Sequence, residues 1–172
     1  MNFVYIQIPV KMNQTQYNFK IKAIHQNKTL PLFELSDSEL IKQNALKIFV
    51  DKKPGFPCRI SLEDANIGEE VILFHYQHLN VTSPYKASGP IFVRKNAKTA
   101  VLEVNEIPAM FTDSLLSIRG YDHNAMMIDA KTIQGVTLFD TIQLLFNNSK
   151  IEYLHIHNAN PGCYNCQVDR ID

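Results

Sequence analysis

The chain has 172 residues, and its 17 basic residues balance its 17 acidic ones. This length suits one domain, and the neutral net charge gives no electrostatic footprint for nucleic acid or an anionic membrane surface. No apolar run approaches the roughly 20 residues of a membrane-spanning helix, and the first residues lack the features of a signal peptide. Three cysteines are too few for a disulfide scaffold, so we expect a cytoplasmic protein with free thiols.

The first half of the chain predicts strands separated by short helical segments. Residues 1–16 form a weakly patterned lead-in. A capping box at Ser36 to Glu39 begins a short helix that ends near Asn44, and a second capping-type start at Ser61 predicts one helical turn. The polar stretch 81–90 predicts a loop. The expected strands cover residues 17–24, 45–50, 70–77, 91–94 and 99–104.

The second half predicts two hairpins with a helix between them. The hairpins combine strands 115–121 with 126–133 and 151–158 with 164–171, and apolar residues at helical spacing predict a helix over 136–146. The pattern indicates a single α+β domain over 17–172, built on a largely antiparallel twisted sheet with two or three short helices. If the helix makes a parallel crossover, the sheet is mixed.

The last hairpin holds most of the residues with chemical potential. Alternation places His155 and His157 on one face of its first strand, together with Tyr153, and places Leu154 and Ile156 on the other. If the connecting loop has an even number of residues, Cys166 joins the histidine face and Cys163 joins the face of Leu154. A β-bulge at the turn would reverse this assignment.

Several segments together resemble a known family. They are LFELSDSEL (32–40), DKKPGFPCRISLEDANIGEEVILFHY (51–76), SPYKASGPIFVR (83–94), LLSIRGYD (115–122), MMIDA (126–130), LHIHNANPGCY (154–164) and VDR (168–170). The chain is similar over about 17–170 to domain-of-unknown-function family number 1203, a group of small bacterial proteins. The resemblance implies one small soluble domain and no particular activity. Many members have Ala-Ala where this chain has Asn165-Cys166, which argues against an essential role for Cys166.

A zinc site is the first chemical possibility. Cys163 and Cys166 form a CxxC pair, and with His157 and Cys58 they supply ligands acceptable to zinc. A regular hairpin, however, directs the two cysteines of the pair to opposite faces. We therefore predict no stoichiometric zinc and no cofactor. A redox role for the CxxC pair lacks the upstream βαβ unit that supports it.

The catalytic residues cannot be assigned from the sequence. Cys58 precedes Arg59, whose charge would favour a thiolate nucleophile if a histidine such as His157 came close. The favoured interpretation is that Cys58 is a small buried hydrophobe. The weak catalytic candidates are thus Cys58, His157 and Cys163, and no role is assigned to His25 or His78.

Arg119 is the main candidate for ligand binding. It lies within a predicted strand, where a buried guanidinium needs a partner. Either Asp129 on the adjacent strand supplies it, or an anionic ligand does. We expect a polar pocket for a small anionic molecule; the alternatives are a Cys- or His-dependent enzyme and a protein-interaction module with an unknown partner. The residues expected to line the pocket are Ser83, Tyr85, Arg119, Asp129, His157 and Arg170.

Overall fold

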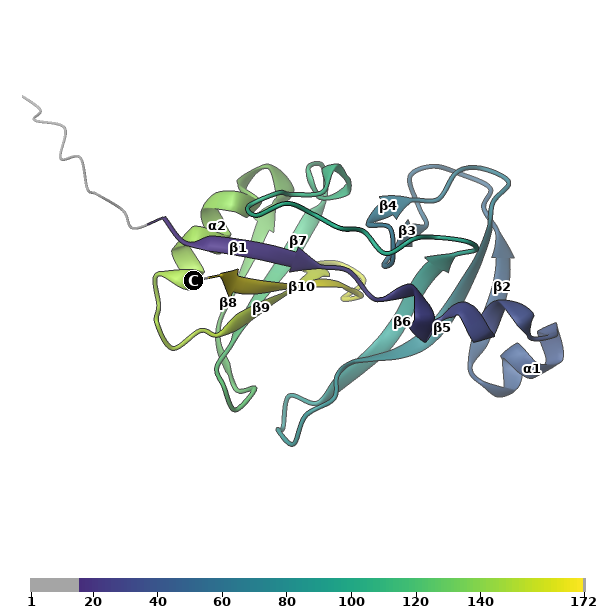
Figure 1. Cartoon of the computed structure of the whole chain (residues 1–172), viewed down its shortest axis with the longest axis horizontal. Coiled ribbons are helices and arrows are strands. Elements are labelled where there is room, and N and C mark those ends of the chain that lie inside the picture. Colours follow the sequence, from purple (N-terminus) through teal and green to yellow (C-terminus); the bar gives the residue numbers. More distant parts are fainter. Residues whose placement is uncertain (1–15, 172) are drawn as a thin grey trace, which may run out of the picture.

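The computed structural model describes residues 16–171, so all but the last residue of the expected lead-in lies outside the described part. Its strands form two five-stranded sheets, which we call sheet A and sheet B. The chain enters sheet A as β1, crosses over to build sheet B, and then returns to complete sheet A (Figure 1). Each sheet is therefore assembled from pairings between distant parts of the sequence.

Sheet A has the strand order β1-β10-β9-β7-β8, and all of its neighbouring strands are antiparallel. The strands are β1 (Asn18–Lys22), β7 (Leu115–Tyr121), β8 (Met127–Gln134), β9 (Tyr153–Asn158) and β10 (Tyr164–Ile171). Both predicted hairpins are present, β7–β8 and β9–β10.

Sheet B has the strand order β2-β5-β6-β3-β4. Its long hairpin joins β5 (Glu70–Leu79) to β6 (Ala87–Arg94), and the remaining strands are β2 (Ala45–Phe49), β3 (Pro57–Cys58) and β4 (Glu63–Asp64). Within residues 16–171, the only parallel pairing joins Cys58 of β3 to Phe92 of β6.

Helices are short and few. The α-helices are α1 (Asp37–Lys42), which has the predicted capping box, and α2 (Leu138–Phe146). Single 3-10 segments are η1 (Gln26–Lys28), η2 (Leu30–Glu34), η3 (Ala109–Phe111) and η4 (Gly135–Thr137). In the described part of the chain, none of these helices has the length and apolar character needed to cross a membrane.

Two main hydrophobic cores support the sheets. Helix α2 covers one face of sheet A, where Ile142 and Phe146 pack with Leu154 and Ile156 of β9. A separate core under sheet B includes Ile72, Ile91 and Cys58. Leu154 and Ile156 are both fully buried, so the face of β9 that carries His155 and His157 is the one turned away from α2.

Arg59 and Tyr164 connect the two sheets. The Tyr164 side chain, which comes from β10 of sheet A, belongs to the core of sheet B. Arg59 follows β3 and is fully buried; its Nε donates to the carbonyl oxygen of Tyr164 at 2.8 Å, and a second guanidinium nitrogen donates to the carbonyl oxygen of Pro57. Burial lowers the pKa of Arg59 to about 10, so this guanidinium remains a cation that ties sheet B to β10.

The fold differs from the expected single sheet with two or three helices. There are two sheets, and strands account for 39% of residues 16–171 against 19% for helices. Helix α2 does connect two strands that run parallel, but β7 lies between them, so every pairing in sheet A is antiparallel. The crossover through α2 therefore does not make sheet A mixed; the mixed sheet is sheet B, through the parallel β3–β6 pairing, and both sheets are largely antiparallel as predicted.

Three local predictions were also wrong. The segment from Ser61 turns and forms β4 instead of a helix, because Leu62 adopts a left-handed φ of 52° and buries its side chain. Residues 99–104 form no strand; Ala100 and Leu102 alternate because they pack against the sheet A core. Strand β6 begins at Ala87, within the stretch expected to be a loop.

Gly135 offers a test of the close packing between the start of η4 and the backbone of η3. A Cβ atom at this position would lie 1.6 Å from the carbonyl oxygen of Phe111, whereas one at Gly89 would meet nothing within 4 Å. We expect Gly135→Ala to lower the free energy of unfolding by ~3 kcal/mol, because backbone cannot yield as a side chain can. Gly89→Ala, the matched control, should change it by less than ~1 kcal/mol. Equal urea midpoints for the two variants would contradict this packing.

Candidate functional site

The candidate site lies on the face of sheet A opposite α2. As predicted, Tyr153, His155 and His157 share this face of β9, while Leu154 and Ile156 point into the core. The neighbouring strand β7 places Arg119 directly across from His155 and Ser117 directly across from His157. The face therefore combines imidazole rings with a cation and a hydroxyl group.

A β-bulge in β10 decides which of its side chains reach this face. Tyr164 pairs with His157, but Cys166 pairs with Ile156, so one extra residue, Asn165, is accommodated between them. Tyr164 consequently joins the histidine face and Cys166 joins the core. The regular pairing that would put Cys166 beside the histidines is therefore not found, and the alternative of a β-bulge that reverses the assignment is confirmed for Cys166.

His78 completes the site from sheet B. It lies on β5 within an irregularity of the β5–β6 pairing between Tyr76 and Leu79, and such irregularities redirect side chains. Its ring stacks on that of Tyr164 with centroids 4.8 Å apart, and its centroid is 5.1 Å from that of His157. Sequence reasoning missed His78, because no local pattern indicates that a β5 residue meets β9.

The three histidines bring ring nitrogens together, and each ring has at least one buried nitrogen without a hydrogen-bond partner. One nitrogen from each of His78, His155 and His157 lies within 4.8 Å of the others. Buried nitrogens without a partner include Nδ1 of His78, Nε2 of His157 and both ring nitrogens of His155. Buried polar groups are normally satisfied, so this concentration in one place requires an explanation.

The orientation of His157 is fixed by a hydrogen bond. Its Nδ1 lies 3.0 Å from the carbonyl oxygen of Gly162 in the β9–β10 turn. A carbonyl oxygen only accepts, so Nδ1 carries the proton and donates it. The lone pair of His157 is therefore on Nε2, which is buried and has no hydrogen-bond partner.

The environment keeps these imidazoles neutral. Burial lowers the pKa of His78 and His155 to about 4 each and that of His157 to about 3. The positive charge of Arg119 lowers the pKa of all three further. Near neutral pH each ring thus presents a free lone pair, as a metal ligand must.

Tyrosines surround the histidines and Arg119. Tyr121 and Tyr153 stack with centroids 5.3 Å apart, and both contact His155. Tyr85, from the β5–β6 loop, packs edge-on against Tyr121 at 6.3 Å. Ser83 of the same loop donates to the carbonyl oxygen of Ala125 at 2.9 Å, which joins this loop to the β7–β8 turn at the border of the site.

Arg119 does not pair with Asp129. In the β7–β8 register Arg119 lies across from Ala130, and Asp129 lies across from Gly120, so the two side chains are on opposite faces. Asp129 instead forms an ion pair with Lys131 at 3.2 Å. The half-buried Arg119 takes part in none of the ion pairs found among residues 16–171, and its Nε is 3.4 Å from Oγ of Ser117.

The remaining candidates are dispersed. Arg170 lies on the α2 side of sheet A, where it donates to the carbonyl oxygen of Phe146 at 2.8 Å. Cys58 is buried in the core of sheet B, and Cys166 in that of sheet A. Cys163 is half-buried in the turn. Among the described residues the three histidines are the group arranged to hold a metal ion, whereas Cys58, His157, Cys163 and Cys166 are not so arranged.

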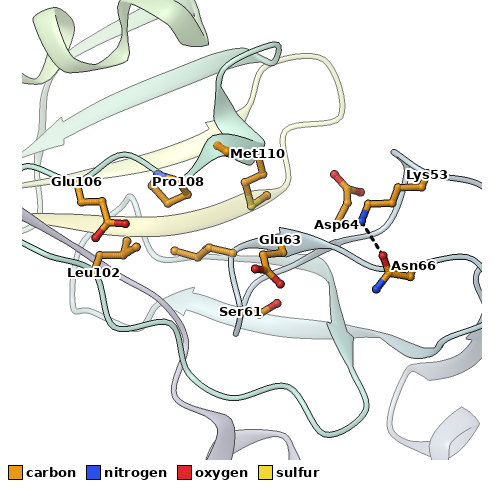
Figure 2. Close-up of a pocket in the computed structure, with 11 residues that line it drawn as sticks. Lys53, Ser61, Glu63, Asp64, Asn66, Leu102, Glu106, Pro108 and Met110 are labelled. Atoms are coloured by element: carbon orange, nitrogen blue, oxygen red, sulfur yellow. Dashed lines mark hydrogen bonds between the residues drawn. The ribbon is translucent and has the colours of Figure 1, made fainter.

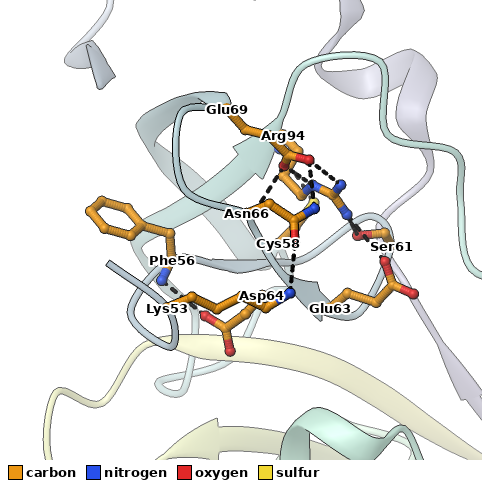
Figure 3. Close-up of polar contacts among 9 residues, drawn as sticks. All are labelled: Lys53, Phe56, Cys58, Ser61, Glu63, Asp64, Asn66, Glu69 and Arg94. Carbon is orange, nitrogen blue, oxygen red and sulfur yellow. Dashed lines mark hydrogen bonds and ion pairs between the residues drawn. The ribbon is translucent and has the colours of Figure 1, made fainter. Parts of the chain in front are cut away.

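A cleft of about 560 Å³ lies elsewhere, between the β3–β4 region and the segment before β7 (Figure 2). Its acidic side chains already have partners. Asp64 accepts from the backbone amides of Gly55 and Phe56, and Glu63 pairs with Arg94, which also binds Glu69 (Figure 3). The Asp64 contacts hold the loop before β3, and the Arg94 contacts join β6 to β4 and to the loop before β5. Glu63 and Asp64 therefore have structural roles.

The comparison with known proteins identifies the family. The family model described as "Protein of unknown function (DUF1203)" matches residues 55–170. The chain belongs to this family, as its sequence segments indicated. Neither a curated protein nor a solved structure is detectably similar to it. The matched range includes His78, Arg119, His155 and His157.

The placement of Arg119 and Asp129 on opposite faces predicts that the two residues are energetically independent. The effects of Arg119→Met and Asp129→Leu on the free energy of unfolding should add to within ~0.5 kcal/mol in the double variant. Urea denaturation of the four proteins measures this coupling. A coupling of ~3 kcal/mol or more, as expected for a buried ion pair that loses one partner, would contradict the observed register.

The lowered histidine pKa values predict a pH-dependent stability. The unfolded chain takes up protons as the pH falls below about 6.5, and the folded metal-free protein does so only near pH 4. The free energy of unfolding should therefore be largest above pH 6.5 and fall progressively as the pH drops from about 6.5 toward 4. His155→Gln should flatten this dependence and His75→Gln should not, because His75 is exposed. If the free energy of unfolding depended on pH equally in the parent and in His155→Gln, the imidazole of His155 would not be buried in its neutral form.

Proposed function

We propose that this protein binds one divalent transition-metal ion, with zinc the natural choice, through His78, His155 and His157. The observation that carries the proposal is that ring nitrogens of three histidines from two different sheets lie within 4.8 Å of one another, and that each of these rings has a buried nitrogen without a partner. A bound metal ion would satisfy one nitrogen of each ring at once. Imidazole is a preferred donor for zinc, copper, nickel and iron.

The geometry requires a small contraction on binding. Zinc–nitrogen bonds of about 2.0–2.1 Å in a tetrahedral site place the donor atoms roughly 3.3 Å apart. His78 is half-buried and is the least buried of the three rings, so we expect its side chain to make most of this movement. The hydrogen bond from Nδ1 of His157 to Gly162 supports the proposal, since metal-binding histidines usually donate their second ring nitrogen to a fixed acceptor.

This ligand set leaves one coordination position open. Three neutral nitrogen donors with a vacant fourth position are characteristic of zinc sites that bind an exchangeable ligand, whereas structural zinc sites are closed by a fourth side chain. We therefore propose a centre that presents its metal to a small molecule. The set differs from the cysteine-containing one on which the prediction of no zinc was based, and this proposal replaces that prediction.

A cysteine-based reaction has less support from the structure than metal binding by the histidines. Cys58 and Cys166 are fully buried, and burial raises the pKa of the Cys166 thiol well above its usual range. Cys58, Cys163 and Cys166 are all free. Free thiols are usual in a reducing compartment, which supports the cytoplasm as the proposed location.

Metal titration of the protein, first stripped with a chelator, tests the proposal. Cobalt(II) should bind with a stoichiometry of one per chain and give the visible spectrum of a four- or five-coordinate site, and zinc should displace it. His78→Gln should weaken zinc affinity at least ~100-fold, because it removes one of three donors. His78 is the least buried of the three ligands, so this variant is the one best placed to remain folded.

His75→Gln is the matched control. His75 lies on the same strand, but it is exposed and contacts Ser88, so this variant should bind metal as the parent does. Thermal melts should show that zinc raises the melting temperature of the parent and of His75→Gln but not of His78→Gln. Equal zinc affinity in all three proteins, or no stoichiometric binding to the parent, would overturn the proposal.

A further inference from the structure

We propose that the open position of the metal centre takes a small oxyanion, which bridges the metal ion and the guanidinium of Arg119. One oxygen of a carboxylate or phosphate group would coordinate the metal, and a second would accept hydrogen bonds from Arg119. This inference rests on the proposed metal site and names the chemical class of its ligand.

The position of Arg119 is the first observation. It is the cross-strand neighbour of His155, on the same face of sheet A. Directly opposite residues on one face have Cβ atoms about 4.5–5.5 Å apart. A guanidinium on this long side chain can therefore reach an atom bound next to the imidazole of His155, whereas Asp129, on the other face, cannot compete for it.

The charge balance is the second observation. Three neutral imidazoles leave the two positive charges of a bound divalent ion uncompensated, and Arg119 adds a third. The carboxylate nearest in the register is Asp169, across from Tyr153 on β10, and it is already paired with Lys22 and accepts from Gln167 at 2.6 Å. Unpaired charge at a partly buried position is costly, so a metal-loaded site needs an anion from solution.

The geometry of the Arg119 guanidinium beside the metal ion favours an oxyanion over a simple halide. Arg119 presents a planar fork of N–H donors, which matches the paired oxygens of a carboxylate or phosphate. A metal ion takes one such oxygen as a direct ligand. A monatomic anion can neutralise charge, but it cannot satisfy the metal and the guanidinium through separate atoms.

The tyrosines indicate what the rest of the ligand resembles. Tyr121, two residues from Arg119, is itself only 2% exposed, but the rings that pack on it are accessible: Tyr153 is half-buried and Tyr85, from the β5–β6 loop, is exposed. Aromatic surfaces of this kind bury apolar or planar groups. Among simple oxyanions, one with a planar apolar body should therefore bind more tightly than one without.

The test uses zinc-loaded protein and three probes, which are benzoate, acetate and inorganic phosphate. Calorimetry measures their affinities, and cobalt-loaded protein reports direct coordination through a change in its visible spectrum. We expect one or more of the probes to bind at one per metal ion, with benzoate tighter than acetate. Phosphate binding in the same manner would support the inference and assign the ligand to the phosphate class.

Variants separate this inference from the metal proposal. Arg119→Lys should weaken oxyanion binding at least ~10-fold, because Lys keeps the charge but loses the fork. It should leave zinc affinity unchanged within about twofold. Lys131→Gln is the matched control. It removes a positive charge on the adjacent strand, where Lys131 pairs with Asp129 and not with the site. The oxyanion affinity of this variant should equal that of the parent.

Each contrary result has a distinct meaning. Stoichiometric zinc binding with no response to any of the three probes would overturn the oxyanion inference and leave the metal site intact. Equal probe affinity in the parent and Arg119→Lys would also overturn it. Oxyanion binding of equal strength to the metal-free protein would exclude the bridging role of the metal, and absence of zinc binding would refute both proposals.

Discussion

The register of β9 between β7 and β10 is the constraint on which the site depends. A strand directs successive side chains to opposite faces, so burial of Leu154 and Ile156 under α2 obliges His155 and His157 to occupy the other face. His78 of sheet B covers the two imidazoles, which are only 1% exposed, whereas Arg119 and Tyr153 on the same face are half-buried. The bulge at Asn165 then lets Tyr164 cover the histidines while Cys166 stays in the core. One pairing irregularity thus separates a thiol from the site and supplies an aromatic ring to it.

Contact between the two sheets turns this face into a potential metal centre. Sheet A by itself carries two imidazoles, and the third comes from β5 of sheet B, beside a second pairing irregularity. Arg59 and Tyr164 hold the sheets together at the same place, through a buried hydrogen bond and through aromatic packing. Binding of a metal ion across this junction would link the two sheets further. The metal centre would then stabilise the contact between the sheets as well as bind a ligand.

The polar groups of the molecule differ in whether their hydrogen-bonding capacity is used. Around the cleft lined by Glu63 and Asp64, carboxylates are paired with Arg94 or with backbone amides, so that region is satisfied by the fold itself. On the histidine face, ring nitrogens remain without partners and Arg119 remains without a carboxylate. Unused donors and acceptors in a buried setting are costly to folding, and a ligand that satisfies them is the simplest reason for their presence.

The sequence by itself determined the local features whose physics is local. The alternation of 151–158, the β7–β8 hairpin, the capping box of α1 and the family membership could all be read from neighbouring residues, because strand and helix periodicity act over a few positions. The predictions of a helix at Ser61 and of a strand at 99–104 were wrong because packing against a core overrode the local pattern.

Only the tertiary structure decided the composition of the site. Which strand lies beside β7, on which face Asp129 falls, and that His78 meets His157 all depend on register, bulges and sheet packing. Register, bulges and sheet packing are set by contacts between buried side chains that lie far apart in the chain, so no short stretch of sequence contains the information.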